Sequence, residues 1–287
     1  MSRIAYVNGR YLPHRQAAIH VEDRGFQFAD GVYEVIGVQG GCLIDERPHL
    51  ERLARSLAAL SIKAPMGERS LAHVMRETVR RNRVRSGILY LQITRGVARR
   101  DHAFPADAAP SLVMTARGNT MRAQEIAEKG CVAITVPDIR WKRCDIKTVS
   151  LLANVLAKQQ ANDVAAFEAI QVDEDGFITE GSTTNVWIIG QDGVLVTRPA
   201  DHAILDGVTR RAIITLAARA ALIFEERAFS VDEAKAAAEA FLTGTTAFVM
   251  PVTRIDDSAI GDGVPGPFSL RLLADYMAHA AAGGDCS

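Results

Sequence analysis

The sequence predicts a two-domain α/β protein with mixed sheets, and three observations lead to this fold class. The chain has 287 residues, about twice the length of a typical domain, so it can form two hydrophobic cores. Segments with the composition of strands are more numerous than simple strand–helix–strand repeats allow. A polar stretch at 116–122, ARGNTMR, interrupts the pattern. We therefore expect an N-terminal, smaller α/β domain at 1–116, an interdomain linker at 117–122 and a C-terminal, larger α/β domain at 123–287.

Two segments define the first domain best. Residues 31–39 (GVYEVIGVQ) are rich in β-branched and aromatic residues and end at Gly40-Gly41, which predicts a strand that enters a hairpin. Pro48 precedes leucines with helical spacing and predicts the start of a helix. The other elements expected here are a strand at 4–6 before an Asn-Gly turn, a helix at 70–82, and strands at 88–94 and 111–115.

The second domain alternates helices and strands. A helix expected at 149–165 has Leu152, Val155, Leu156 and Gln159 on one side. The other predicted elements are helices at 123–129, 207–222, 232–239 and 268–280, a strand at 131–136, and further strands separated by turn sequences at 173–176 and 191–193.

Composition excludes several classes of protein. The 33 basic and 34 acidic residues give a formal charge of −1, whereas nucleic-acid binding needs a basic surface. The sequence has no run of 18 apolar residues and no apolar leader, so we expect neither membrane binding nor export but a cytoplasmic protein. Cys42, Cys131, Cys144 and Cys286 show no metal-binding spacing, which predicts free thiols and no metal site.

Lys147 is the first candidate for chemistry. It lies where an extended segment is predicted to pass into a helix, and Arg143 lies four residues before it. A lysine amine becomes nucleophilic when it is desolvated or close to another cation. A solvated surface lysine is the ordinary alternative, and the residues alone favour it.

Glu180 is the second candidate. If the strand alternates regularly, Glu180 shares an apolar face with Ile178 and Val186. A carboxylate there needs a cation. The cation could be a protein arginine or a positively charged ring nitrogen of a ligand, and a bulge at Gly181 would change the face.

Three further segments could bind anions. Residues 205–210 form a glycine turn that leads into a helix, 243–246 (TGTT) add hydroxyl groups, and the loop at 94–105 carries Arg100 and His102. Each also fits ordinary capping, turn or solvated-loop chemistry.

Together these residues resemble the fold-type IV, pyridoxal-phosphate-dependent aminotransferases, and most closely their D-amino-acid transaminases. The resemblance extends over nearly the whole chain, in order and spacing. The matching stretches are 22–28 (EDRGFQF), 30–35 (DGVYEV), 49–53 (HLERL), 94–96 (TRG), 140–141 (RW), 143–147 (RCDIK), 156–159 (LAKQ), 179–182 (TEGS), 185–186 (NV) and 207–210 (GVTR).

The resemblance implies a role for each candidate. Lys147 would form the Schiff base with pyridoxal 5'-phosphate and move the α-proton of the substrate, while Glu180 would keep the pyridine nitrogen protonated. The phosphate would be bound by Arg52, Val208, Thr209 and Thr245. A carboxylate stabilises a protonated ring, and a helix start with a guanidinium suits a phosphate.

The resemblance also implies the substrate. Tyr33, Arg100 and His102 match the residues that bind the carboxylate of a D-amino acid, and in that family the loop pair comes from the neighbouring subunit of a homodimer. The implied reaction is a ping-pong transfer from a D-amino acid, such as D-alanine or D-glutamate, to 2-oxoglutarate or pyruvate. Arg99, Asp101 and Trp187 depart from the family pattern and leave substrate breadth open. The alternatives are an (R)-selective amine transaminase or an enzyme that accepts both substrate types, a branched-chain L-aminotransferase and an aminodeoxychorismate lyase. Outside enzymes, the alternative is a cofactor-binding protein without turnover.

Overall fold

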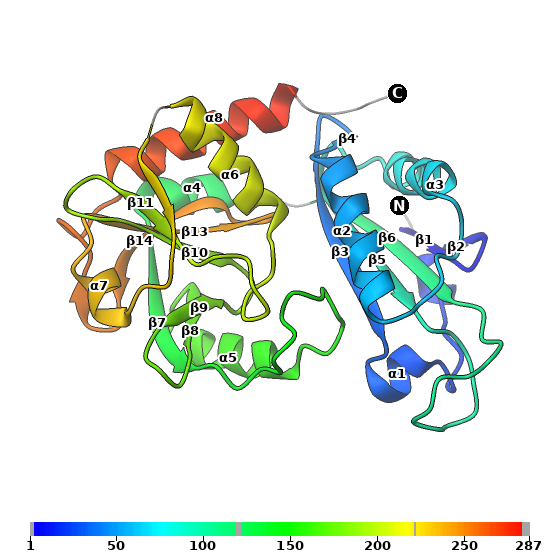
Figure 1. Cartoon of the computed structure of the whole chain (residues 1–287). Coiled ribbons are helices and arrows are strands. Elements are labelled where there is room, and N and C mark those ends of the chain that lie inside the picture. Colours follow the sequence, from blue (N-terminus) through cyan, green and yellow to red (C-terminus); the bar gives the residue numbers. More distant parts are fainter. Residues whose placement is uncertain (1–2, 119–121, 221, 283–287) are drawn as a thin grey trace. The chain divides into compact units, whose positions relative to one another are not determined.

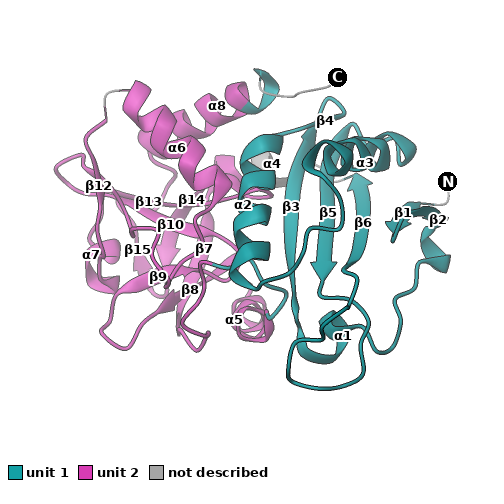
Figure 2. Ribbon diagram, turned by 45° about the vertical axis from the view of Figure 1, so that its right-hand side comes forward, with its two compact units in different colours: residues 1–120, 146–150, 280–287 teal, residues 121–145, 151–279 magenta. Residues whose placement is uncertain are grey.

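The computed structural model describes residues 3–118, 122–220 and 222–282. The chain forms two compact units, each with one sheet and its own helices, so the predicted fold class is confirmed (Figures 1 and 2). Unit 1 comprises 1–120, 146–150 and 280–287, and unit 2 comprises 121–145 and 151–279. The predicted linker at 117–122 lies partly outside the described residues, and the predicted domain limits stay a prediction.

Unit 1 contains a six-stranded sheet with the order β2-β1-β6-β5-β3-β4. All its strand pairs are antiparallel. The strands are β1 (Ile4–Val7), β2 (Arg10–Pro13), β3 (Gly31–Gln39), β4 (Cys42–Leu43), β5 (Ser86–Thr94) and β6 (Ser111–Gly118). The helices are η1 (His14–Gln16), α1 (Arg24–Phe28), α2 (Glu46–Ala59) and α3 (Glu68–Arg81). β3 has the predicted bounds, and α2 begins two residues before Pro48.

The core of unit 1 lies on one face of this sheet. Val32 and Ile36 of β3 are fully buried there, and Leu53 of α2 and Met75 of α3 belong to the same cluster. Tyr33 and Val35 point to the opposite face, because side chains alternate along a strand, and they are half-buried. The alternation therefore separates a structural face from a face that is available for chemistry.

The chain contributes a second, short segment to unit 1 at 146–150. The N–H of Tyr33 donates to the Lys147 carbonyl, and the N–H of Val149 donates to the Gly31 carbonyl, both at 3.0 Å. Thr148 forms an antiparallel bridge with Val32. Because these residues pair with β3, helix α5 begins at Leu152 and not at the predicted residue 149. Lys147 thus belongs to unit 1, although we expected it in the C-terminal domain.

Unit 2 contains a mixed sheet with the order β12-β11-β10-β13-β14-β7-β8-β9, and β15 pairs with β14. β7 pairs in parallel with β14 and β8, as β11 does with β12. The strands are β7 (Cys131–Pro137), β8 (Glu168–Val172), β9 (Ile178–Gly181), β10 (Asn185–Ile189), β11 (Leu195–Thr197), β12 (Phe224–Glu226), β13 (Glu239–Gly244), β14 (Phe248–Ile255) and β15 (Ser258–Ala259). The helices are α4 (Arg122–Lys129), α5 (Leu152–Asp163), α6 (Val208–Arg219), α7 (Val231–Lys235) and α8 (Pro267–Ala282), and the last residues of α8, 280–282, belong to unit 1.

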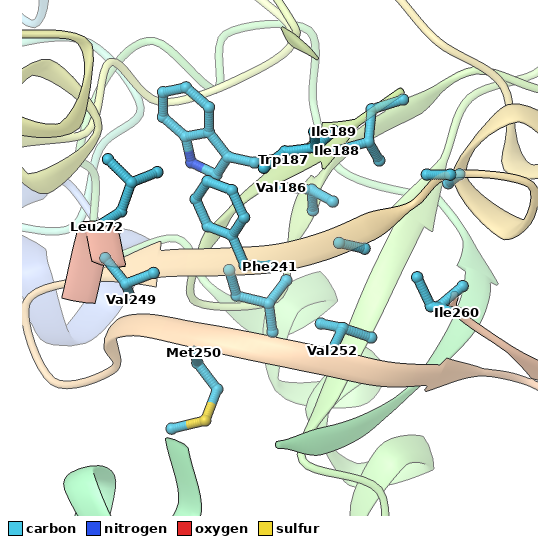
Figure 3. Close-up of a cluster of buried hydrophobic side chains, with 14 of the residues drawn as sticks. Val186, Trp187, Ile188, Ile189, Phe241, Val249, Met250, Val252, Ile260 and Leu272 are labelled. Carbon is cyan, nitrogen blue, oxygen red and sulfur yellow. The ribbon is translucent and has the colours of Figure 1, made fainter. Parts of the chain in front are cut away.

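Aromatic stacking marks the centre of the unit 2 core (Figure 3). The rings of Trp187 and Phe241, on paired strands, are 5.6 Å apart and nearly parallel. Trp187 also donates from Nε1 to Oγ1 of Thr243 at 2.9 Å, so its polar atom is satisfied although the residue is fully buried.

Several sequence-based expectations are wrong. The helix expected at 232–239 ends at Lys235, because Glu239 begins the central strand β13. Glu180 does not share one regular strand with Val186, because β9 ends at Gly181 and its pairing with β8 is irregular. Cys42 is disulfide-bonded and so is not a free thiol, while Cys131 and Cys144 are free and Cys286 lies outside the described residues. None of the described helices has the length and apolar character needed to cross a membrane.

Candidate active site

Lys147 is held by its backbone, whereas its amine is left unpaired. Its N–H donates to Oγ of the buried Ser56 at 3.2 Å, and its carbonyl accepts from Tyr33. Nζ lies 4.3 Å from the centre of the Tyr33 ring. Within the part of the chain that the structure describes, this half-buried amine has no hydrogen bond or ion pair. A lysine without a carboxylate partner is suited to nucleophilic chemistry.

Tyr33 belongs to a small polar group on the half-buried face of the unit 1 sheet. Its ring lies 5.8 Å from that of Tyr90, whose hydroxyl donates to Oε1 of Gln92 at 2.6 Å. Burial, and secondarily Tyr33, raise the pKa of Tyr90 to about 12. Both phenols therefore belong to the same face as the Lys147 amine, and Tyr90 stays protonated at neutral pH.

Arg52 lies in a buried cluster behind this face. Both oxygens of Glu34 accept from it, Oε1 from Nε and Oε2 from Nη2, each at 2.8 Å. Oε2 also contacts Nδ1 of His49 at 2.7 Å. Burial alone raises the pKa of Glu34, but the Arg52 charge and hydrogen bonds outweigh burial and hold that pKa well below its usual range. Arg52 is thus fixed by an ionised carboxylate.

Arg100 and His102 lie on the exposed loop between β5 and β6. Both pack against the ring of Phe28, with the Arg100 guanidinium carbon 4.6 Å and the His102 ring centroid 5.4 Å from its centroid. Among the described residues, no hydrogen bond or ring contact joins either side chain to Tyr33 of the same chain. Unit 1 therefore brings Lys147 to Tyr33 but does not bring the loop pair to them.

In unit 2, Glu180 is paired with a protein arginine. Oε1 accepts a short hydrogen bond from Nη1 of Arg140, and Oε2 accepts from Nδ2 of Asn185 at 3.2 Å and from the Leu205 N–H at 3.1 Å. Arg140 also binds Asp138 through Nε at 2.9 Å and Nη2 at 2.6 Å. Burial alone lowers the pKa of Arg140, but the opposite effect of Asp138 and Glu180 is larger, and the net pKa is raised. The arginine is therefore permanently charged. The arginine partner that we considered for Glu180 is thus present.

The start of α6 carries two of the predicted phosphate ligands. Val208 and Thr209 are the first two residues of this helix, both are buried, and no described side chain caps their N–H groups. Buried first-turn N–H groups without a cap need an acceptor from outside the helix. A side chain at Gly207 would place its Cβ 2.1 Å from Oδ1 of Asn185, so glycine is required where this turn approaches β10. Asn185 links the turn to Glu180.

Thr245 lies in the tight turn between β13 and β14 and is half-buried. The preceding residue, Gly244, approaches Thr183 and Thr184 of the loop between β9 and β10. The fully buried carboxylate of Glu168 fixes this loop, because it accepts from the hydroxyls of Ser182, Thr183 at 2.8 Å and Thr184 at 3.0 Å. The loop therefore supports the turn that carries Thr245.

No role was predicted from the sequence for the residues that orient these groups, namely Glu34, His49, Ser56, Arg140, Asn185 and Glu168. One signal existed for Arg140, because an arginine two residues after an aspartate can form a local ion pair. For Ser56 the comparable signal was a small polar residue beside the apolar Leu53 and Leu57 of a helix. No local sequence pattern identifies Glu34 as the partner of Arg52.

Comparison with known proteins assigns the family. Residues 31–255, more than half of the chain, match the family of class IV amino-transferases. The chain belongs to this family and is an aminotransferase.

Two relatives are similar over almost the whole chain. The D-alanine aminotransferase of Bacillus licheniformis is 42% identical over 265 residues, which cover 92% of this chain and 93% of the relative. That of Staphylococcus epidermidis is 39% identical over 271 residues, 94% of this chain and 95% of the relative.

Solved structures share the fold. A T.th. branched-chain amino acid aminotransferase with pyridoxamine 5'-phosphate has a TM-score of 0.88 at 27% identity, over 98% of this chain and 95% of that one. The Escherichia coli branched-chain enzyme has a TM-score of 0.91 at 24% identity, over 99% and 97% of the two chains, and shows the fold alone.

Proposed function

We propose that this aminotransferase moves the amino group of a D-amino acid, such as D-alanine or D-glutamate, to a 2-oxo acid, such as 2-oxoglutarate or pyruvate, by a ping-pong mechanism. The observation that carries the proposal is the presence of Tyr33, Arg100 and His102 in a chain that is 42% identical to a D-alanine aminotransferase. The structurally similar branched-chain enzymes are only 24–27% identical, so sequence favours the D-amino-acid reaction over the branched-chain one.

The residues fit pyridoxal 5'-phosphate as the cofactor. The unpaired amine of Lys147 suits a covalent bond to an aldehyde, and the uncapped N–H groups of Val208 and Thr209 suit a phosphate. We assign the phosphate to these N–H groups, the Thr209 and Thr245 hydroxyls and Arg52, and the ring nitrogen to Glu180. The cofactor, when bound, supplies an electron sink for the pair left on the substrate Cα.

The residues of the protein would move and hold the protons of the reaction. Nζ of Lys147 would take the proton from Cα of the substrate and return it to the product, since its backbone is fixed at both N–H and carbonyl. Glu180 would hold a proton on the ring nitrogen, and Arg140 and Asn185 keep its carboxylate oriented. Tyr90 and Tyr33 provide two phenol groups on the same face.

The substrate carboxylate would be bound by Tyr33 together with Arg100 and His102 of a neighbouring subunit. The loop pair is exposed and does not contact Tyr33 of its own chain. The segments around it also expose large apolar side chains, with Val21 69%, Phe26 76% and Phe104 62% accessible, which is typical of an interface. We therefore propose a homodimer in which each loop serves the partner's site, and a cytoplasmic location, as the sequence predicts.

Three other reactions of this fold are separated by substrate. Transamination of (R)-phenylethylamine, transamination of L-leucine and pyruvate release from aminodeoxychorismate would identify the amine, branched-chain and lyase activities. The half-reaction with each of these compounds, and with D- and L-alanine, can be followed from the cofactor spectrum. The rates rank the four activities directly.

Arg100→Ala tests the carboxylate site. It should weaken the use of D-alanine by about 2–5 kcal/mol, the range for truncation of one member of a buried charge pair. An amine without a carboxylate should lose little. Arg99→Ala, which changes the exposed neighbour, is the matched control. An equal loss with both substrates would assign Arg100 to folding or assembly and would contradict the proposal.

Subunit mixing tests the shared site. Lys147→Ala and the double variant Arg100→Ala/His102→Ala should each have little activity alone. Reassociated dimers should regain about a quarter of the wild-type activity, because half of them pair an intact lysine with an intact loop. If the loop acted on its own subunit, mixing would restore nothing.

A further inference from the structure

The loop at 95–110 is long but closed at its base. Gly96 has φ +98°, and a Cβ there would lie 1.8 Å from the Ala109 carbonyl, so the two ends of the loop touch. Arg95 is buried and binds Asp30 at 2.7 Å and the Leu60 carbonyl at 2.7 Å, with Phe104 on its guanidinium. Sixteen residues without a helix or strand of their own are unusual in a compact domain and often have a function.

The Arg24 guanidinium binds the backbone at the tip of this loop, residues 100–102. Arg24, at the start of α1 and only 3% exposed, donates from Nε to Asp30 at 2.8 Å. Its Nη1 donates to the Asp101 carbonyl at 2.5 Å, and its Nη2 contacts the His102 carbonyl at 3.4 Å. The backbone on the carboxyl side of Arg100 is thereby attached to α1, which lies beside the loop in both views (Figures 1 and 2).

The side chains of the tip rest on Phe28, one turn after Arg24. The guanidinium carbons of Arg24 and Arg100 lie 4.8 Å and 4.6 Å from the centre of its ring, and the His102 ring centroid is 5.4 Å away. An aromatic face attracts a guanidinium and orients it parallel to the ring. Arg24 and Phe28 thus fix both the backbone and the two functional side chains of an otherwise exposed loop.

We propose that Arg24 and Phe28 are positioning residues that determine specificity for the substrate carboxylate, because they hold Arg100 and His102 in place. This rests on the proposed function of the loop pair. Neither residue touches the substrate. Their effect is to reduce the conformational freedom that Arg100 and His102 lose when a carboxylate binds.

The test uses Phe28→Leu, which keeps an apolar side chain but removes the aromatic face, in the holoenzyme. KM for D-alanine should rise about fivefold with kcat little changed, because a contact of Arg100 with the ring is lost. Phe28→Tyr should restore KM. Phe177→Leu, the same substitution at an exposed ring of unit 2, is the matched control and should leave KM within about 1.5-fold. Arg24→Lys keeps the charge beside Asp30 but loses the forked contacts, and should raise KM similarly.

Two measurements separate positioning from general stability. In an Arg100→Ala background, Phe28→Leu should raise KM little further. Hydrogen exchange of peptides from 96–105 should accelerate in Phe28→Leu and Arg24→Lys but not in Phe177→Leu. A full additive rise in KM in that background, or unchanged exchange, would overturn the proposal. Failure of the proposed function would appear differently, as an unchanged D-alanine KM in Arg100→Ala itself, and the exchange result would still decide whether the loop is held.

Discussion

Glu34 in unit 1 and Arg140 in unit 2 are both buried charges that hold an oppositely charged partner through hydrogen bonds. In unit 1 a carboxylate, fully buried, orients the Arg52 guanidinium, and His49 completes its coordination. In unit 2 an arginine orients the Glu180 carboxylate, and Asp138 completes its coordination. The two clusters use the same ion pair with the roles of its members exchanged.

The exchanged roles of carboxylate and arginine follow from the part of the cofactor that each cluster is proposed to bind. A phosphate needs a cation, so the anion of the pair in unit 1 serves as the support. A protonated ring nitrogen needs an anion, so in unit 2 the cation serves as the support. In both cases the supporting residue has a second partner. Removal of one charge from such a buried pair leaves the other charge uncompensated.

Lys147→Ala gives the largest expected effect and leaves both clusters intact. Turnover should fall by at least about 10³-fold, because the proton acceptor is lost. Cofactor should still bind non-covalently through the phosphate ligands. Borohydride reduction and peptide mapping of the wild type should find the label on Lys147. Label on Lys142 or Lys158 would show that the lysine is wrongly assigned.

Glu34→Gln should reduce the free energy of unfolding by about 3–5 kcal/mol, because the buried Arg52 charge loses its anion. It should also weaken cofactor affinity, measured by equilibrium dialysis. Glu51→Gln, which breaks the exposed pair with Arg47 on the same helix, is the control and should change stability by less than about 0.5 kcal/mol. Similar losses in the two variants would mean that Glu34 is no support for Arg52.

Glu180→Gln should slow single-turnover proton abstraction by about tenfold or more, since one unit of pKa at the ring nitrogen corresponds to about 1.4 kcal/mol. Its effect on cofactor affinity should be smaller than that of Glu34→Gln, because the phosphate ligands are unchanged. Glu225→Gln, a surface change in the same unit, should have no effect. Unchanged single-turnover rates would reduce Glu180 to a structural residue.

His49→Asn gives the smallest expected effect, and its signature is in the pH dependence. Burial lowers the pKa of His49, although Glu34 opposes the shift, so the unfolded chain takes up this proton at a higher pH than the folded chain. The free energy of unfolding should therefore fall as the pH drops below about 6.5. His49→Asn should remove this decline, measured by urea unfolding between pH 7.5 and 3. The separate decline from Glu34, whose pKa is lowered, begins below about pH 4.3 and should persist. Identical pH profiles would exclude His49.

Local pattern predicted the strands well and the tertiary contacts poorly. β3 was predicted with its bounds, because two glycines end a β-branched run. Helix α5 was predicted three residues too early, since nothing local shows that 146–150 pairs with a strand more than a hundred residues away. Its face at Leu152, Val155 and Leu156 is exposed in the single chain, which periodicity cannot foresee. The alanines before Glu239 concealed the end of α7.

The candidate site was predicted by resemblance more than by physics. For Lys147 and Glu180, the residues alone suggested a functional role only as one of two alternatives. The other site roles came from the family pattern, namely those of Arg52, Val208, Thr209 and Thr245. The supports Glu34 and Arg140 were missed because an ion pair between distant positions leaves no local trace in the sequence. These residue roles stay predictions until the variants are measured.

The pairing of 146–150 with β3 also protects the sheet during synthesis. Until this segment forms its bonds to Gly31 and Tyr33, the start of β3 presents unpaired N–H and C=O groups along an edge that another chain could join. The two sides of the contact are 117 residues apart, so at usual translation rates Thr148 is synthesised about 6 to 23 s after Gly31. The segment that carries the proposed nucleophile therefore also protects the sheet edge against aggregation. Circular permutants opened between 140 and 150 should associate more readily than those opened at other loops.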